Sequence, residues 1–195
     1  MRCGTCCKNS GPTLHREDAA LVPHSIPWSA LVTFRKGEFA YHPTLGRLIE
    51  LPADMIKIKG KNKGFTCIFF EIETNDCTIY MERPVECRTL ACWAPEPVME
   101  MFLKDLLERT MIFGHGPLKE IIDDYDTRFP PARLMQYLTE KNRAAIARME
   151  EEDRAYRNRL VNEGISKVNT LDLFLGRPVS MLRAAMETLF RDPCI

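Results

Sequence analysis

Apolar residues occur in short runs along the first 94 residues, and turn residues separate the runs. The segments 31–34 and 38–41 flank Arg35-Lys36-Gly37, which predicts a hairpin with a short turn. Residues 55–60 alternate apolar and basic side chains, as a strand with one exposed face does. The other elements predicted in this half are strands over 47–51, 67–71 and 77–80 and a short helix from Pro84.

Beyond residue 94 the apolar residues recur at the spacing of helices. Between residues 131 and 163 they follow one another at intervals of 4 or 7, at Leu134, Leu138, Ala145, Met149, Tyr156 and Leu160. Such a repeat keeps the stripe on one face of a nearly straight helix, so one long helix is predicted there. Further helices are expected over 98–110, 118–125 and 178–190.

The two patterns together predict an α+β protein, in which a small strand-rich half precedes a helical half. A boundary near Ala94 is indicated, because seven of the eight cysteines precede it and two prolines follow it. We therefore expect a cysteine-rich domain over residues 1–94 and a helical C-terminal region over 95–195. The long apolar stripe is expected to pack within its own region. A homodimer or another protein partner that uses the helical half is the alternative.

Charge and hydropathy exclude several classes of protein. The chain has 27 basic and 27 acidic residues, balanced within each half, so we expect no nucleic-acid partner. Its apolar runs are far shorter than the ~20 residues that span a bilayer, and the N-terminus lacks the apolar core of a signal peptide. We expect a cytoplasmic protein without a membrane partner, in which thiols stay reduced. Eight cysteines then need a role other than structural disulfides.

The spacing of the cysteines is typical of a metal site. It reads C-x2-C-C, then 59 residues, then C-x9-C-x9-C-x4-C. A C-x2-C pair lets one short loop present two thiolates to one ion, and remote cysteines complete the shell. Thiolates favour zinc, iron and iron–sulfur clusters. The candidate ligands are Cys3, Cys6, Cys7, Cys67, Cys77, Cys87 and Cys92.

Seven thiols exceed the four that one zinc ion needs, which leaves open a cluster, two sites or some cysteines without a ligand role. Neighbouring side chains usually point in different directions, so Cys6 and Cys7 are expected to serve different places, one of them pairing with Cys3. If 67–71 is an extended strand, about 16 Å of chain separates Cys67 from Cys77. The two would then not share an ion unless the loop begins earlier.

Buried, unligated thiols are the alternative for part of the set. Cys92 fits either role, and Cys194 is predicted to be a buried apolar side chain. A thiol–disulfide oxidoreductase is disfavoured, because no βαβ pattern precedes Cys3.

The order of the motifs resembles a known family. Cys3-Gly4-Thr5-Cys6-Cys7, Cys77-Thr78-Ile79-Tyr80 and Arg83-Pro84-Val85-Glu86-Cys87-Arg88 follow one another, with the stretches 11–18 and 67–70 between the first two. Residues 1–93 are thereby similar to the YkgJ-type cysteine-cluster (CxxCxxCC) family of zinc- or iron-chelating domains. The resemblance implies metal ligation by Cys3, Cys6, Cys7, Cys67, Cys77 and Cys87.

One feature departs from the family pattern, which has a further cysteine three positions before Cys3. That position lies before Met1, so either the start is assigned too late or this member lacks one ligand. A related domain in bacterial flagellin lysine methylases implies an iron–sulfur cluster. A [4Fe-4S] cluster is therefore an expected cofactor beside zinc and iron, although methylase activity is not implied, and a bacterial source is expected.

The expected function is the binding of zinc, iron or an iron–sulfur cluster through clustered thiolates. A cluster-dependent redox or group-transfer enzyme is one alternative, and an interaction module with a purely structural zinc is the other. The sequence contains no G-x-S-x-G, Walker A, Rossmann glycine motif or H-E-x-x-H. No catalytic residue is therefore assigned, and whether the protein is an enzyme stays open.

Some polar residues outside the cysteines are also candidates. His15 and Asp18 are spaced i, i+3, and exposure on an N-terminal helix is favoured over a ligand or acid–base role. Arg83 and Arg88 are expected to offset thiolate charge or to pack at the surface. The acidic runs near 123–126 and 150–153 are predicted to form a solvated face.

Overall fold

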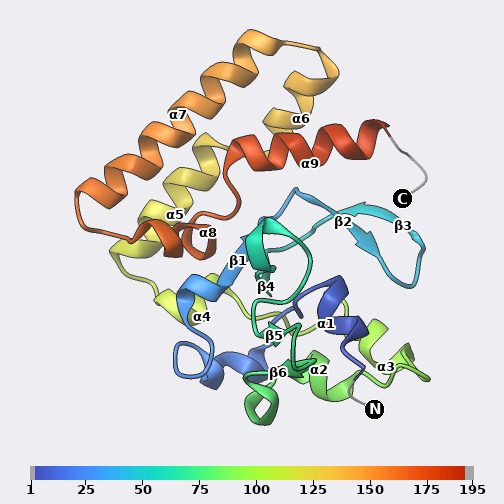
Figure 1. The fold of residues 1–195 in the computed structure, drawn as a ribbon. Coiled ribbons are helices and arrows are strands. Elements are labelled where there is room, and N and C mark those ends of the chain that lie inside the picture. Colours follow the sequence, from blue (N-terminus) through green and yellow to red (C-terminus); the bar gives the residue numbers. More distant parts are fainter. Residues whose placement is uncertain (1–2, 192–195) are drawn as a thin grey trace.

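The computed structural model describes residues 3–191 of the chain, so Cys194 lies outside the described residues. The fold is α+β, as predicted, with short antiparallel strand pairs in the first half and mostly helices in the second. Figure 1 shows the long helices together at one end of the molecule and the N-terminal segment at the other, with the strands between them.

Two antiparallel strand pairs form the middle of the molecule. β1 (Leu31–Phe34) pairs with β4 (Met55–Ile58), and β2 (Phe39–His42) pairs with β3 (Arg47–Glu50). The predicted strands are therefore present, but the predicted hairpin between the first two is wrong. The hairpin that forms instead joins β2 to β3 through a turn in which Gly46 has a φ of 62°.

The chain between β1 and β2 explains this pairing. Gly37 N donates to the Leu51 carbonyl oxygen at 2.9 Å, and Leu51 N donates to the Glu38 carbonyl oxygen at 2.8 Å. The turn therefore bonds to the end of β3 and not to β1. The buried Glu38 carboxylate also accepts from Arg35 N at 3.1 Å, which fixes the turn in place.

In the second half, the apolar pattern predicts one long helix where the structure has two. α6 (Pro131–Thr139) and α7 (Arg143–Asn162) replace the single helix predicted over 131–163. Lys141, with a φ of 54°, reverses the chain between them, and the Asn142 side chain accepts from Ala145 N at 3.1 Å. That hydrogen bond is an N-cap, which starts a new helix. The apolar stripe is real, but two packed helices share it.

The helix predicted over 98–110 is also wrong. α3 (Glu96–Met99) ends early, and α4 (Arg109–Phe113) begins ten residues later. Leu103 and Asp105 have positive φ values between them, so the chain cannot continue as a right-handed helix. The predicted helices over 118–125 and 178–190 are confirmed as α5 (Pro117–Arg128) and α9 (Val179–Arg191).

Contacts between the two halves cross residue 94 at several points. The short helix α8 (Leu171–Phe174) packs against β1, and Thr33 Oγ1 donates to the Leu173 carbonyl oxygen at 2.6 Å. Leu107 and Leu173 also belong to the apolar core of the first half, beside Leu31. Independent domains over 1–94 and 95–195 stay a prediction.

Part of the predicted acidic face is buried. Asp153 is only 2% exposed, and its carboxylate accepts from Tyr125 Oη, Arg157 Nε and Val179 N at 2.6–2.8 Å. Buried carboxylates are retained where donors surround them in this way. Asp153 therefore joins α5, α7 and the start of α9, and the expectation of solvation is wrong for this residue.

Candidate metal centre

The fold gathers the seven candidate cysteines around two adjoining cavities. The inner cavity, of about 210 Å³, is lined by Cys6, Cys7, Cys67, Cys77 and Cys87. The outer cavity, of about 240 Å³, is lined by Cys3, Cys6, Cys7, Cys77, Cys87 and Cys92. Four separate chain segments therefore contribute thiols to one region, although more than 80 residues separate the first cysteine from the last.

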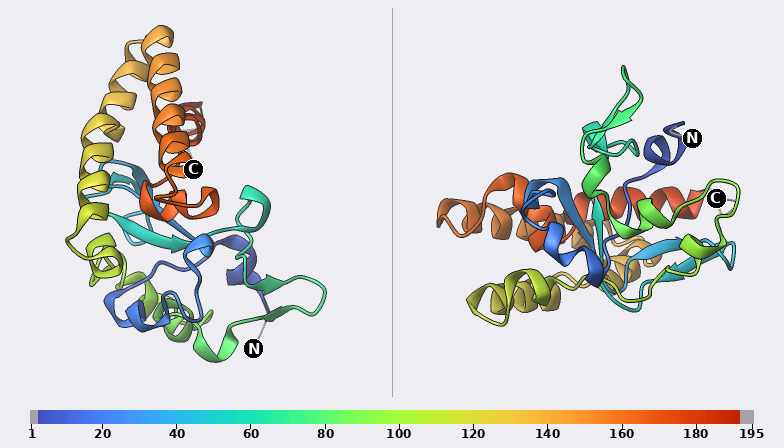
Figure 2. Two further views of the ribbon diagram at one scale, coloured as in Figure 1. Left: turned by 90° about the vertical axis from the view of Figure 1, so that its left-hand side faces the viewer. Right: turned by 90° about the horizontal axis from the view of Figure 1, so that it is seen from below.

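Short elements bring these segments together. α1 (Thr5–Asn9) carries Cys6 and Cys7, and α2 (Val85–Thr89) carries Cys87. Cys67 N donates to the Cys7 carbonyl oxygen at 2.7 Å, which ties the 67–77 region to α1. Both views in Figure 2 show the N-terminal segment beside the segment that includes Cys67 and Cys77.

Gly4 allows the first cysteine loop to lie close to this region. Its φ is +71°, and an added Cβ would lie 2.5 Å from Phe70 Cζ and 2.7 Å from Asn75 Oδ1. No L side chain fits at that distance, so the position requires glycine for its conformation and for its space. Gly4 therefore lets the C-x2-C loop lie directly against Phe70.

The thiols of Cys6 and Cys7 lie on the same side of the chain. Their Sγ atoms are 3.9 Å apart, so the expectation that the two side chains diverge is wrong for this pair. Two thiolates on one tetrahedral zinc, at Zn–S distances of about 2.3 Å, would be about 3.8 Å apart. The observed separation therefore suits two ligands of one ion.

Cys67 and Cys77 line the same inner cavity, although an extended strand would have kept them apart. β5 (Phe70–Glu71) and β6 (Asp76–Cys77) are only two residues each, and Phe70 pairs with Cys77. Phe70 N donates to the Cys67 carbonyl oxygen at 3.0 Å, which turns the chain before β5 begins. The loop begins earlier than a full strand would allow, and the 16 Å separation does not apply.

Burial and crowding raise the pKa values of the inner thiols. Burial first, and then the neighbouring Cys6, Cys67 and Cys77, raise the pKa of Cys7 to about 12. Burial is also the main reason that the pKa values of Cys67 and Cys87 are raised. Several thiolates this close repel one another, and a bound cation relieves that repulsion.

The outer thiols are in a different environment. Cys3 and Cys92 are both exposed. Hydrogen bonds with Thr5, and one with the Cys92 thiol, lower the pKa of the Cys3 thiol. Cys3 and Cys92 are therefore neighbours in the outer cavity, which Cys6 and Cys7 also line, and a shared ion for Cys3 and a cysteine of α1 stays a prediction.

The donor set fits zinc, iron or an iron–sulfur cluster, because thiolates are the ligands that these metals prefer. Within residues 3–191, no three His, Cys, Asp or Glu side chains lie close enough to a common point to coordinate one metal ion. The thiols line the walls of the two cavities instead.

Two charged residues that the sequence pattern did not single out also line the inner cavity. Lys57, at the centre of β4, reaches it beside Glu86 of α2. Burial lowers the pKa of Lys57, while Glu86 and Cys87 partly oppose that shift. Lys57 is partly exposed between the buried Ile56 and Ile58, so the predicted alternation holds, but its side chain faces the cavity. The residues beside Lys57 in the sequence do not indicate that its side chain faces a cavity lined by cysteines.

His15 and Asp18 are buried, so the expectation of an exposed helix surface is wrong. The Asp18 carboxylate accepts from His15 N at 3.0 Å and from Val85 N at 2.9 Å. His15 Nδ1 donates to the Lys104 carbonyl oxygen at 2.8 Å, and its Nε2 lies 3.3 Å from Glu86 Oε1. Burial acts to lower the pKa of His15, but these contacts outweigh it and the pKa is raised.

Glu86 completes this polar network, because its Oε2 accepts from Thr13 N at 2.7 Å. The network joins the segment 13–18 to the first turn of α2. His15 and Asp18 therefore contribute to the position of α2, the helix that carries Cys87.

The arginines near the cysteines are partly engaged elsewhere. Arg83 packs over the Tyr80 ring at 4.0 Å, and its Nη1 donates to the Tyr80 carbonyl oxygen at 2.9 Å. Arg88 pairs with Glu17 at the surface. Both arginines still line the outer cavity, so their positive charge lies beside the thiols.

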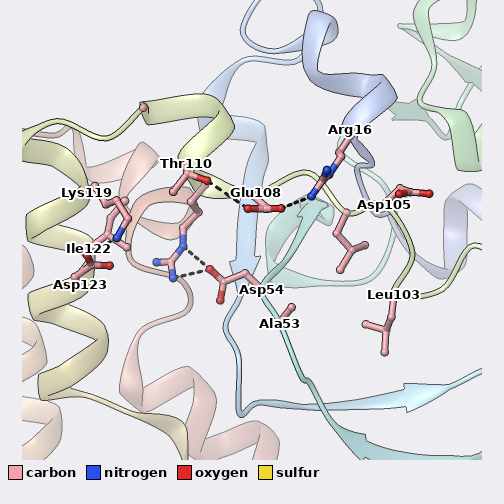
Figure 3. A pocket seen from close by; sticks show the side chains of 13 residues that line it. Arg16, Ala53, Asp54, Leu103, Asp105, Glu108, Thr110, Lys119, Ile122 and Asp123 are labelled. Atoms are coloured by element: carbon pink, nitrogen blue, oxygen red, sulfur yellow. Dashed lines mark hydrogen bonds and ion pairs between the residues drawn. The ribbon is translucent and has the colours of Figure 1, made fainter.

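A separate cavity of about 470 Å³ lies between the 103–110 segment and α5 and contains no cysteine (Figure 3). Arg16 Nη2 lies 2.6 Å from Glu108 Oε1, and Arg109 Nε donates to Asp54 Oδ2 at 2.7 Å. Opposite charges on its walls therefore pair with one another. These pairs hold the two halves together, and we assign the cavity no ligand.

The helices of the described chain include none with the length and apolar character that crossing a bilayer requires.

The comparisons with known proteins concern the same cysteines. No solved structure matches the chain. The family model described as "CxxCxxCC: Putative zinc- or iron-chelating domain" matches residues 1–105, more than half of the sequence. The chain therefore belongs to the CxxCxxCC family of zinc- or iron-chelating domains.

Proposed function

We propose that the protein binds zinc, iron or an iron–sulfur cluster through Cys3, Cys6, Cys7, Cys67, Cys77, Cys87 and Cys92. One observation carries the proposal, namely the gathering of these seven thiols from four chain segments around two adjoining cavities. Several thiolates gathered in one region repel one another, and a thiophilic metal ion offsets that repulsion and prefers thiolate ligands.

The chain's own residues have three roles in this function. The thiols supply the bonds to the metal. Lys57, Arg83 and Arg88 place positive charge beside the thiolates and so lower the energy of their ionised forms. Asp18 and Glu86 hold α2, and Gly4 lets the first loop approach Phe70.

A bound metal would cross-link α1 to the 67–92 segment and so contribute its binding free energy to folding. We propose a reducing, cytoplasmic environment for the protein, in which these thiols remain available. The outer cavity, which opens beside the exposed Trp93, favours a centre accessible to other molecules over a closed structural site.

The direct test is elemental analysis and a visible spectrum of the full-length protein purified without oxygen. Bound zinc or iron, lost when Cys6 and Cys87 are both replaced by serine but retained in Cys194→Ser, is the expected result. A coloured protein with iron and acid-labile sulfide would identify a cluster, and a colourless zinc protein would exclude it. Wild-type chain that neither carries nor takes up zinc or iron overturns the proposal.

A further inference from the structure

The seven thiols are divided between the two cavities in an uneven way. Cys67 lines only the inner cavity, whereas Cys3 and Cys92 line only the outer cavity. The remaining four, Cys6, Cys7, Cys77 and Cys87, line both. The centre therefore has two ends and a shared wall between them.

The two ends differ in their exposure to solvent. Cys67 is 6% exposed and belongs to an apolar core that includes Phe70 and Leu14. Cys3 and Cys92 are both exposed, and Trp93 beside them is 77% exposed. A metal at the inner end would be shielded from water and from competing ligands, whereas one at the outer end would be open to both.

The number of thiols also fits two positions. Two tetrahedral ions need eight thiolate positions, so seven thiols suffice when a single thiolate bridges both ions. Cys67 with three shared thiols would complete the inner shell. Cys3 and Cys92 with two shared thiols would complete the outer shell, which uses one of the four shared thiols twice.

We propose that the chain binds two thiophilic divalent ions, a slowly exchanging one in the inner cavity with Cys67 and a readily exchanging one in the outer cavity with Cys3 and Cys92. This inference rests on the proposed function, and it assigns different tasks to the two ions. The inner ion stabilises the fold, and the outer ion is available for exchange with soluble ligands. Exchange replaces one metal–ligand bond by another and needs no oxidant or reductant.

The first test uses the wild-type chain and Zn²⁺ alone. Reduced, metal-free protein is titrated with Zn²⁺ against a competing chelator, and native mass spectrometry counts the bound ions. We expect two ions per chain with affinities at least tenfold apart. Alkylation followed by peptide mapping should find Cys3 and Cys92 reactive in the one-zinc form and protected in the two-zinc form, with the buried Cys67 as the protected reference in both.

The second test uses variants that remove only the outer end. The double variant Cys3→Ser/Cys92→Ser should bind one Zn²⁺ with the affinity of the tighter wild-type class, and Cys194→Ser should still bind two. Cys67→Ser should lose the tighter class, with circular dichroism as the check that the chain is folded. Because the alkylation experiment uses unmodified protein, the proposal remains testable even if this last variant unfolds.

The outcomes separate this inference from the proposed function. A chain that binds no metal overturns both. One zinc per chain, or four irons with four sulfides, keeps metal binding but overturns the two-ion assignment. Two ions that are lost together in Cys3→Ser/Cys92→Ser, or equal alkylation of Cys3 and Cys67 in the one-zinc form, also overturns it.

Discussion

The carboxylate of Asp18 accepts a hydrogen bond from the backbone N–H of Val85 at 2.9 Å, across 67 residues of sequence. Val85 is the first residue of α2, and Cys87 follows within the same turn. The first four N–H groups of a helix lack partners within it, and a buried acceptor fixes where the helix starts. One carboxylate thus helps to set the position of one thiol of the candidate metal centre.

Replacing Asp18 by alanine should therefore weaken both folding and metal binding. Two N–H groups, on His15 and Val85, would lose their acceptor, at a cost of about 2–3 kcal/mol in the free energy of unfolding. Chemical denaturation and Zn²⁺ competition measure the two effects. Glu17→Ala is the matched control, because Glu17 only pairs with Arg88 at the surface and should change stability by less than about 1 kcal/mol. Equal effects of the two substitutions would contradict this role for Asp18.

Gly4 and Gly164 offer a comparison between two glycines of nearly equal φ, at +71° and +70°. Substitution of either by alanine costs about 1 kcal/mol for the left-handed conformation. Only at position 4 would the new Cβ also meet Phe70 and Asn75, because nothing lies within 4 Å at position 164. We expect Gly4→Ala to reduce Zn²⁺ affinity and Gly164→Ala to leave it unchanged, as measured by competition titration. Similar affinities for the two variants would remove the steric argument.

Lys57 should contribute its positive charge to metal binding. Lys57→Met keeps most of the side-chain volume and removes the charge beside Cys87, which should lower metal affinity by about tenfold, as losses near metal ligands commonly do. Lys57→Arg should restore much of the affinity. Lys59→Met serves as the control, because Lys59 pairs with Asp172 at 2.8 Å, away from the cysteines. A loss in Lys59→Met as large as that in Lys57→Met would assign the effect to the strand and not to the charge.

Metal affinity should rise steeply with pH. Burial raises the pKa of the Cys7 thiol to about 12 and raises that of Cys87 as well, so both are protonated near pH 7 in the metal-free chain. Binding as thiolates must release both protons, which makes the binding constant rise at least about 100-fold per pH unit between roughly pH 6 and 8, and each further protonated ligand thiol adds about another tenfold. Chelator competition at several pH values, with proton release followed in weak buffer, checks the slope. Release of less than one proton would exclude ligation by both thiols.

The buried carboxylate of Asp153 should matter for stability and not for metal. Asp153→Ala leaves Arg157 buried without its closest carboxylate and deprives Val179 N of its acceptor, which should cost about 3–5 kcal/mol. Glu151→Ala, on the exposed face of the same helix, should change stability by less than about 0.5 kcal/mol. Thermal unfolding of the metal-free proteins measures both, and a small effect at Asp153 would show that the network is dispensable.

The sequence predicted the elements better than their partners. The strand over 31–34 is present, yet its partner is 55–58, because pairing depends on hydrogen bonds to Leu51 that no local pattern reveals. The apolar repeat across 131–163 is equally present in α6 and α7. The reversal at Lys141 needs a positive φ at a residue that is not glycine, whereas the N-cap at Asn142 is a signal that could have been read.

For the candidate site, too, the sequence predicted which residues take part better than how they are arranged. The cysteine spacing predicted the seven thiols that line the two cavities, because spacing is a property of the chain alone. It did not predict that Cys6 and Cys7 point the same way, which depends on the short helix that carries them. Lys57 and Glu86 were missed as cavity residues, because strand alternation does not say what a side chain faces.

The position of Leu173 in the sequence affects the order in which parts of the core are synthesised. This residue packs in the apolar core of the first half, yet the ribosome adds it about 80 residues after Cys92. At the usual rates of about 5–20 residues per second, several seconds separate the last of the seven thiols from the residue that completes their support. During that interval the growing chain carries these cysteines without the part of the core that Leu173 supplies. The helical half thus adds part of the core of the cysteine-rich half only after all seven of these cysteines have been synthesised.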